Sequence, residues 1–247
     1  MSVFLSAIDF PGMPDLGIPR IDVATHWALT GFRSIETVTP QDVLNWKATV
    51  PADRPRALDL EPTTDLPRFM YYQQIFGSLF DGLYWVNLMR GLNAAARSFL
   101  RQGRLSSYAY PFDRRLFLSQ ANGLDVHRAT HALLREFGAA HGLDAIGFDW
   151  YRWFGMQGPL NALDLNLSEA RKFGRPLDVY LSPYYADIDG PHAGEMIDPD
   201  SWIHDVRDVR RRLSVTDGDR IVIWATGAQS WDPSWPWIDR LRREINA

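Results

Sequence analysis

Short apolar segments with a strand-like pattern alternate with helical segments along the whole chain, and polar or aromatic residues gather where the strand-like segments end. This alternation favours a parallel sheet covered by helices. No glycine-rich turn follows the first strand, which argues against an open dinucleotide-binding sheet. We therefore predict an α/β fold: a single (β/α)8-type, TIM-like barrel, complete or in a seven-stranded or distorted form, that spans residues 1–247 as one domain.

The expected strands are short, apolar and bounded by turn residues. They cover residues 2–8, 21–29, 56–61, 105–111, 145–150, 177–182 and 220–225. The second of them also fits the start of a helix, and we favour the strand.

The expected helices carry start and stop signals in several places. Thr39 followed by Pro40 predicts an N-cap with proline at the first helical position. Gly142 marks the end of another helix. The helical segments cover residues 39–48, 65–104 with a break near Gly82, 125–141, 167–173, 200–213 and 236–245.

The composition excludes several classes of function. A net charge of −4 gives no basic surface for nucleic acid. The absence of cysteine excludes disulfides and thiolate chemistry. Neither an apolar run long enough for a membrane nor a signal segment is present, so we expect a soluble chain, cytoplasmic or secreted after signal removal, without a membrane partner. We expect no cofactor and no metal; His127 and His131, four residues apart, lack the glutamate of a zinc protease.

The central motif is Asp59-Leu60-Glu61, where a strand-like run ends before a proline. In a strand, the side chains of Asp59 and Glu61 lie on the same face, about 6–7 Å apart. Two carboxylates this close repel each other, so one of them tends to hold a proton at neutral pH. A protonated carboxyl group is what general acid catalysis requires. The alternative is a strand that runs into a solvated acidic loop.

The other strand ends carry residues of the kind that bind sugars, because flat aromatic rings stack on sugar rings. The polar and aromatic residues at these ends are Asp9, Asp59, Glu61, Tyr108, Tyr110, Asp149, Tyr151, Tyr184, Tyr185 and Trp224. In a parallel barrel all of them would meet at one face, which favours a functional site. Trp231, Trp235 and Trp237 either line a substrate cleft or hold the last helix on the barrel.

These motifs resemble the hyaluronidase family of glycoside hydrolases and the wider group of chitinase-like barrels. The matching stretches, in the family's order, are Asp59-Leu60-Glu61, Tyr108-Ala109-Tyr110-Pro111 and Ile221-Val222-Ile223-Trp224. The family's cysteines are absent, and Pro62-Thr63-Thr64 stands in place of its aromatic stretch.

The resemblance implies a retaining, substrate-assisted hydrolysis of a carbohydrate with N-acetylated sugars. Glu61 would protonate the glycosidic oxygen, and the acetamido oxygen of the substrate would attack the anomeric carbon. Asp59 would orient that amide, Tyr108 would bond it, and Trp224 would form the floor of the sugar site. The remaining expected substrate contacts are Asp9, Tyr110, Asp149, Tyr151, Tyr184, Tyr185 and Trp231.

Two alternatives remain open. One is a two-carboxylate glycosidase that pairs Glu61 with Asp149 or Asp9 and acts on sugars without an acetamido group. The other is a carbohydrate-binding barrel without catalytic activity. Outside the strand ends, the arginine-rich run 207–212 is expected to be a solvated helix face with ion pairs inside the helix.

Overall fold

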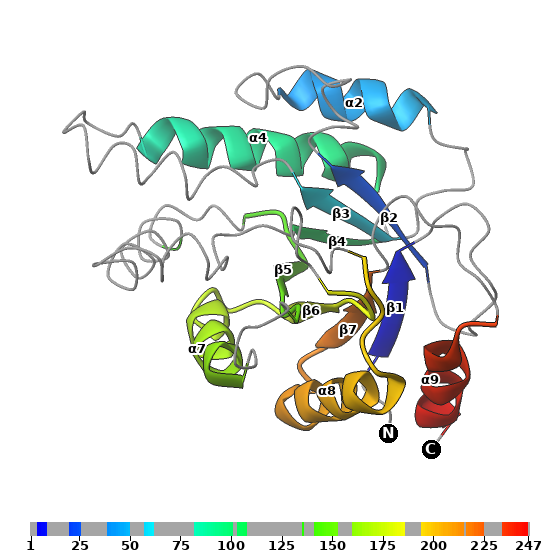
Figure 1. The fold of residues 1–247 in the computed structure, drawn as a ribbon. Helices are drawn as coiled ribbons and strands as arrows, with labels where there is room; N and C mark the ends of the chain where they lie inside the picture. Colours follow the sequence, from blue (N-terminus) through cyan, green and yellow to red (C-terminus); the bar gives the residue numbers. More distant parts are fainter. Residues whose placement is uncertain are drawn as a thin grey trace, which may run out of the picture.

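Seven parallel strands form a closed ring in a computed structural model of the protein (Figure 1). The strands are β1 (Phe4–Ile8), β2 (Arg20–Thr25), β3 (Ala57–Glu61), β4 (Arg104–Ser107), β5 (Ala145–Asp149), β6 (Leu177–Leu181) and β7 (Arg220–Ile223). The structure describes residues 4–8, 20–25, 39–49, 57–61, 82–100, 103–107, 135, 141–152, 160–185, 194–214, 216–224 and 234–246.

Each strand pairs in parallel with the next strand along the chain. The ring closes because β7 also pairs with β1, with Phe4 opposite Arg220 and Ala7 opposite Ile223. The predicted (β/α) barrel is therefore confirmed, in its seven-stranded form among the described residues. The ambiguous segment 21–29 contains the strand β2, which ends at Thr25.

Helices lie around the outside of the ring (Figure 1). Those in the described residues are α2 (Pro40–Thr49), α4 (Gly82–Phe99), α7 (Leu160–Arg171), α8 (Pro199–Arg212) and α9 (Pro236–Asn246). On the outer side of the sheet, α2 packs against α4, and α8 packs against α9.

Alternate residues of each strand pack against these helices. In β6, Leu177, Val179 and Leu181 join the apolar core that also contains Trp202 and Val206 of α8. The intervening Asp178 and Tyr180 are equally buried but lie on the other face of the strand. Burial on both faces explains why Asp178 is the single charged residue among the five residues of β6.

Local signals account for two helix starts. At α2, the Thr39 N–H donates to the Asp42 carboxylate at 2.8 Å and the Asp42 N–H donates to Thr39 Oγ1 at 3.3 Å, a reciprocal cap that precedes Pro40. At α8, Asp198 accepts a hydrogen bond from the Ser201 N–H at 2.9 Å. The helix predicted over residues 125–141 falls mainly outside the described residues, and Gly142 after it has φ +84°.

The prediction for α7 was wrong at both ends. The helix begins at Leu160 and ends at Arg171, whereas we expected residues 167–173. Leu163, Leu167 and Ala170 are all buried, so the apolar face starts a full turn before the expected segment.

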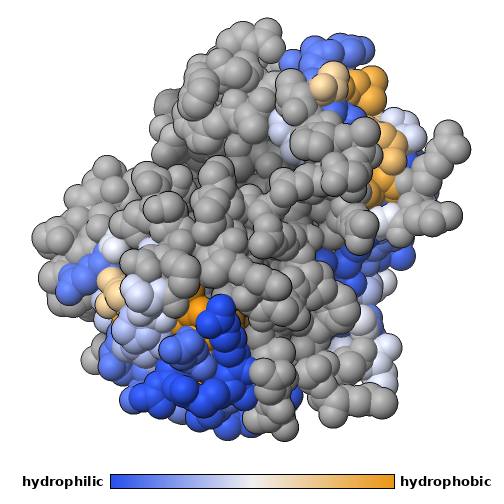
Figure 2. All heavy atoms as spheres, turned by 90° about the vertical axis from the view of Figure 1, so that its right-hand side faces the viewer, coloured by the Kyte–Doolittle hydropathy of each residue, from blue (hydrophilic) through white to orange (hydrophobic). Residues whose placement is uncertain are grey.

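The arginine-rich run of α8 is not simply a solvated face. Asp208 is buried and pairs within the helix with Arg211 and Arg212, as expected. However, Arg207 and Arg210 both bond Glu244 of α9, at 2.8 and 3.2 Å. Figure 2 shows hydrophilic side chains gathered at the lower part of the molecule, where these two helices lie in Figure 1. The run therefore joins two helices as well as facing solvent.

Candidate functional site

The parallel ring brings the carboxyl ends of all its strands to one end of the barrel. Glu61 is the last residue of β3, and Asp149 is the last residue of β5. Tyr151 follows β5 by two residues, and Trp224 comes directly after β7. The predicted site residues on these strands therefore lie at a single end, which is where barrel enzymes carry their reactive groups.

Strand pairing fixes the backbone of Asp59 on both sides of β3 and that of Glu61 on the β2 side. Asp59 lies in register with Val23 of β2 and with Ser106 of β4. Glu61 lies in register with Thr25. The side chains of Asp59, Glu61 and Asp149 lie outside what the structure describes, so their chemical roles stay predictions.

Two predicted site residues, Tyr151 and Trp224, form an aromatic pair at this end. Their ring centroids are 5.3 Å apart with an interplanar angle of 33°. Backbone bonds fix both segments to β6, because the N–H of Trp150 donates to Tyr180 and the N–H of Trp224 donates to Leu181, each at 2.9 Å. Tyr151 is only 6% exposed, while Trp224 is partly exposed. The ring contact of Tyr151 with Trp224 therefore links the segment after β5 to the residue after β7, across the end of β6.

Tyr184 and Tyr185 follow β6 and belong to a short paired segment. The Ile197 N–H donates to the Pro183 carbonyl at 2.8 Å, and the Tyr185 N–H donates to the Glu195 carbonyl at 3.0 Å. Tyr184 is buried edge-on against Trp235, with ring centroids 5.5 Å apart. Tyr185 is the more exposed of the two, so it is the better placed to meet a ligand.

The tryptophans near the C-terminal helix divide between packing and surface. Trp237 is fully buried and contacts Trp202 of α8 at 5.2 Å between ring centroids. Two roles were expected for this tryptophan cluster, and the burial of Trp237 fits the role of holding the last helix on the barrel. Trp235 is half-buried between Trp237 and Tyr184.

Four predicted site residues lie outside the described residues: Asp9, Tyr108, Tyr110 and Trp231. The same holds for His127 and His131. Within the part of the chain that is described, no three histidine or carboxylate side chains are grouped in a way that would hold a metal ion. None of the described helices is long and apolar enough to cross a membrane.

Sequence reasoning missed an ion pair beside the aromatic pair. Arg152, the residue after Tyr151, donates from Nε and Nη2 to the two carboxylate oxygens of Asp205 in α8. The hydrogen bonds that Arg152 donates to Asp205 outweigh the effect of burial and raise the pKa of Arg152. Asp205 is buried, so the pair anchors the end of β5 to α8. No local pattern links two residues so far apart in the chain.

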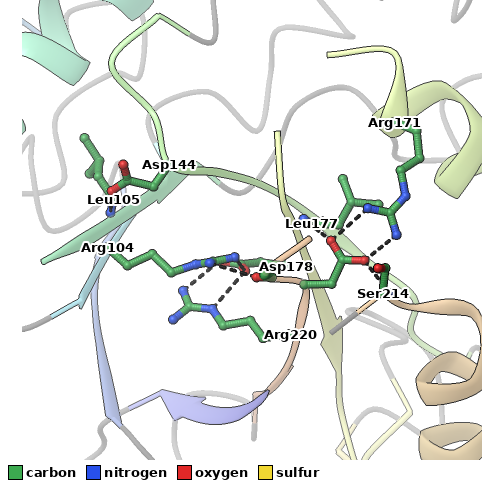
Figure 3. Close-up of polar contacts among 10 residues, drawn as sticks. Arg104, Leu105, Asp144, Arg171, Leu177, Asp178, Ser214 and Arg220 are labelled. Carbon is green, nitrogen blue, oxygen red and sulfur yellow. Dashed lines mark hydrogen bonds and ion pairs between the residues drawn. The ribbon is translucent and has the colours of Figure 1, made fainter. Parts of the chain in front are cut away.

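A second ionic cluster that the sequence analysis missed lies at the opposite end, where the strands begin (Figure 3). Asp178 accepts from Arg220 Nε at 2.8 Å and Nη2 at 2.6 Å, and also from Arg104. Asp178 and Arg220 are buried. On β5, which lies between β4 and β6, the residue in register with Asp178 is Gly147. A charged residue inside an apolar strand was the available signal.

The fold resembles solved glycoside hydrolases at low sequence identity. A GH18 chitinase from Pseudoalteromonas aurantia matches with a TM-score of 0.54 and 14% identity, covering 93% of this chain and 77% of that chain. Bee venom hyaluronidase, in complex with a hyaluronic acid tetramer, matches with a TM-score of 0.48 and 12% identity, covering 85% of this chain and 71% of that chain. A double mutant of an endo-beta-1,4-mannanase from Cellulomonas fimi matches with a TM-score of 0.48 and 10% identity, covering 99% of this chain and 70% of that chain.

No family model matches the sequence, and no curated protein matches it significantly. At these identities, the likeness to the chitinase establishes the barrel fold alone.

Proposed function

We propose that the protein is a glycoside hydrolase with its active site at the carboxyl ends of the strands and Glu61 as the general acid. The observation that carries this proposal is the position of Glu61. It is the last residue of β3 in a closed parallel ring, at the same end as the Tyr151–Trp224 pair. A carboxyl group at the same end of a barrel as aromatic rings suits a sugar, because rings can cover its apolar face while the acid protonates its glycosidic oxygen.

The chemistry that this arrangement supports best is substrate-assisted. Glu61 would donate a proton to the leaving oxygen while the acetamido oxygen of the sugar attacks the anomeric carbon, which forms a cyclic intermediate. Water would then open that intermediate, with Glu61 as the base. Asp59 lies two residues earlier on the same strand, and positions two apart share a face. It would therefore orient the amide from the same side as Glu61.

The proposed substrate is a polysaccharide or oligosaccharide with N-acetylated sugars. The resemblance of the strand-end motifs supports this class, and so does the shared fold with a chitinase. The position of Asp149 at the end of β5 supports the alternative of two carboxylates. In that mechanism the carboxyl groups are about 5–5.5 Å apart in retaining enzymes and about 6.5–9.5 Å apart in inverting ones.

A product assay tests the proposal on oligomers of chitin, hyaluronan, chondroitin and a neutral glucan. We expect cleavage of one or more of the N-acetylated oligomers and none of the glucan. Equal turnover of the acetylated and deacetylated forms of one oligomer would rule out substrate assistance and assign the second carboxylate role to Asp149 or Asp9. Binding without cleavage of any oligomer would indicate a carbohydrate-binding barrel.

A thiazoline analogue, which mimics the cyclic intermediate, tests the mechanism separately. Analogues of this kind bind far more tightly than substrate when the intermediate forms. We expect inhibition at much lower concentration than the parent sugar, and weaker inhibition of the Tyr108→Phe variant. Equal affinity for analogue and parent sugar would contradict the cyclic intermediate.

A further inference from the structure

We propose that Arg152 is a positioning residue: its ion pair with Asp205 holds Tyr151 against Trp224 and so builds the aromatic surface on which a sugar rests. The sugar-binding part of this inference rests on the proposed function. The positioning part rests on the described contacts of Arg152, Tyr151 and Trp224 alone.

The first step is that Tyr151 lies between two fixed points. On one side, the N–H of Trp150 donates to the carbonyl of Tyr180 at 2.9 Å, which extends the β5–β6 ladder by one residue. On the other side, Arg152 is tied to α8. Beyond its two bonds to Asp205, its Nη2 also approaches the carbonyl of Ser201 at 3.5 Å. A residue between two such anchors keeps one backbone direction, and its ring therefore keeps one place.

The second step is that the anchor on the α8 side depends on the shape of arginine. The guanidinium group is planar and bonds both oxygens of Asp205 at once, an arrangement that a lysine cannot reproduce. The Asp205 side chain is 8% exposed and that of Arg152 is 31% exposed. Loss of Arg152 therefore leaves the largely desolvated carboxylate of Asp205 without its ion pair, and we expect the segment to move rather than keep this geometry.

The third step is that the position of Tyr151 determines the surface offered to a ligand. Tyr151 is buried and Trp224 is partly exposed, so the tyrosine is the buried member of the pair and supports the more exposed ring. Trp224 is the ring that the resemblance makes the floor of the sugar site. When Tyr151 shifts, Trp224 loses its support, and the affinity for a sugar falls although neither ring has been mutated.

A matched control exists at the other end of the barrel. Arg171 also bonds both oxygens of a buried carboxylate, that of Asp219, and its side chain is 33% exposed. Figure 3 shows Arg171 with Leu177 and Ser214, whose backbone N–H groups bond the same carboxylate. Substitution of Arg171 removes an equivalent ion pair far from Tyr151, so it reports the effect of lost stability alone.

The test compares Arg152→Gln with Arg171→Gln, each with and without Trp224→Phe. The difference in near-ultraviolet circular dichroism between each protein and its Trp224→Phe form isolates the signal of Trp224. We expect this signal to be lost in Arg152→Gln, to be partly kept in Arg152→Lys and to be unchanged in Arg171→Gln. If Arg152→Gln does not fold, Asp205→Asn tests the same pair. An unchanged Trp224 signal in the variants of the Arg152–Asp205 pair would overturn the proposal.

The binding measurement uses the tetramer of N-acetylglucosamine and calorimetry, with Glu61→Gln in every protein to prevent cleavage. We expect the Kd to rise about tenfold in Arg152→Gln and to stay unchanged in Arg171→Gln, as the loss of one aromatic contact implies. An equal rise in both variants would overturn the role in binding. If the parent binds neither this tetramer nor any other N-acetylated oligomer of the product assay while its Trp224 signal depends on Arg152, the proposed function fails and the positioning stands.

Discussion

At the scale of single residues, Glu61 is the side chain on which the proposed chemistry depends most. It ends β3 at the carboxyl end of the ring. We predict that Glu61→Gln lowers the turnover number about 10²–10⁴-fold, the usual cost of losing a general acid. Initial rates on the best substrate measure this, with the thermal unfolding midpoint as a check on folding. Turnover close to that of the parent would show that another group is the acid.

Asp59 is predicted to orient the substrate amide and not to attack the sugar. Azide added to the Asp59→Ala variant should therefore not restore activity, and no glycosyl azide should form. Mass spectrometry of the products measures the outcome. Azide rescue would identify Asp59 as a direct nucleophile and exclude the substrate-assisted mechanism.

The sequence predicts the position of a residue when its neighbours along the chain determine that position, and does not predict it when the partner lies far away in the chain. The positions of Tyr151 and Trp224 follow from the sequence because each lies within two residues of the end of a predicted strand. Their roles in binding stay predictions. The pair of Arg152 with Asp205 had no such signal, because it depends on where α8 lies relative to the segment that follows β5. For the same reason, the bond of Arg220 to Asp178 is visible only once β6 and β7 are known to be neighbours.

At the scale of elements, α8 joins the barrel to its neighbours through charged groups. Asp208, in the middle of the helix, is buried and bonds Arg211 at 2.9 Å, while Arg212 bonds both Asp208 and Asp164 of α7. Burial would raise the pKa of Asp208, but the hydrogen bonds from Arg212 and Arg211 lower it below its usual value of 3.8. The ionised form is therefore the one that stabilises the fold.

This direction predicts how the stability changes with pH. Because the pKa of Asp208 is lower in the folded than in the unfolded state, its contribution is complete above about pH 4 and is lost as the pH falls through the folded pKa. Asp208→Asn should therefore be less stable than the parent at neutral pH, and the difference should shrink in acid. Urea unfolding at several pH values measures this.

The control for that series is Asp217→Asn, because Asp217 lies exposed in the turn before β7. Its substitution should change the free energy of unfolding little at any pH. A difference for Asp208→Asn that stays constant from neutral pH into acid would contradict the role assigned to its ionised form.

Helix starts with a capping signal were predicted well, and those without one were not. Thr39 with Pro40 predicted α2, and Asp198 with Pro199 marks the start of α8. Before α7, no Ser, Thr, Asp or Asn precedes Leu160, so its first turn was missed. The burial of Leu163 on the barrel stabilises that turn, and such a contact cannot be deduced from local sequence.

At the scale of the whole molecule, the two ends of the barrel differ in character. The end where the strands begin holds buried ion pairs around Asp178 and Asp219. The end where they finish holds aromatic rings and the predicted catalytic carboxylates. This division matches barrels in general, where one end serves stability and the other serves chemistry.

We predict that Asp178→Asn lowers the free energy of unfolding by about 3–5 kcal/mol without a direct effect on the substrate site. The substitution removes the negative charge that two guanidinium groups share inside the ring. Denaturant unfolding measures the loss. The control is Asp164→Asn, which removes an exposed partner of Arg212 and should cost about 1 kcal/mol or less. Equal losses in the two variants would contradict the structural role of Asp178.

The pairing of β1 with β7 also determines when the protein can fold during its synthesis. While β7 is still inside the ribosome, β1 has an open edge of backbone N–H and carbonyl groups, and such edges promote aggregation. Because synthesis adds about 5–20 residues per second, β7 emerges several seconds after β1, and the edge of β1 stays uncovered for that time. The five residues of β1 offer a short edge to other nascent chains. Closure of the ring is thus a late event, and we expect chaperones to protect the first strand until the last one arrives.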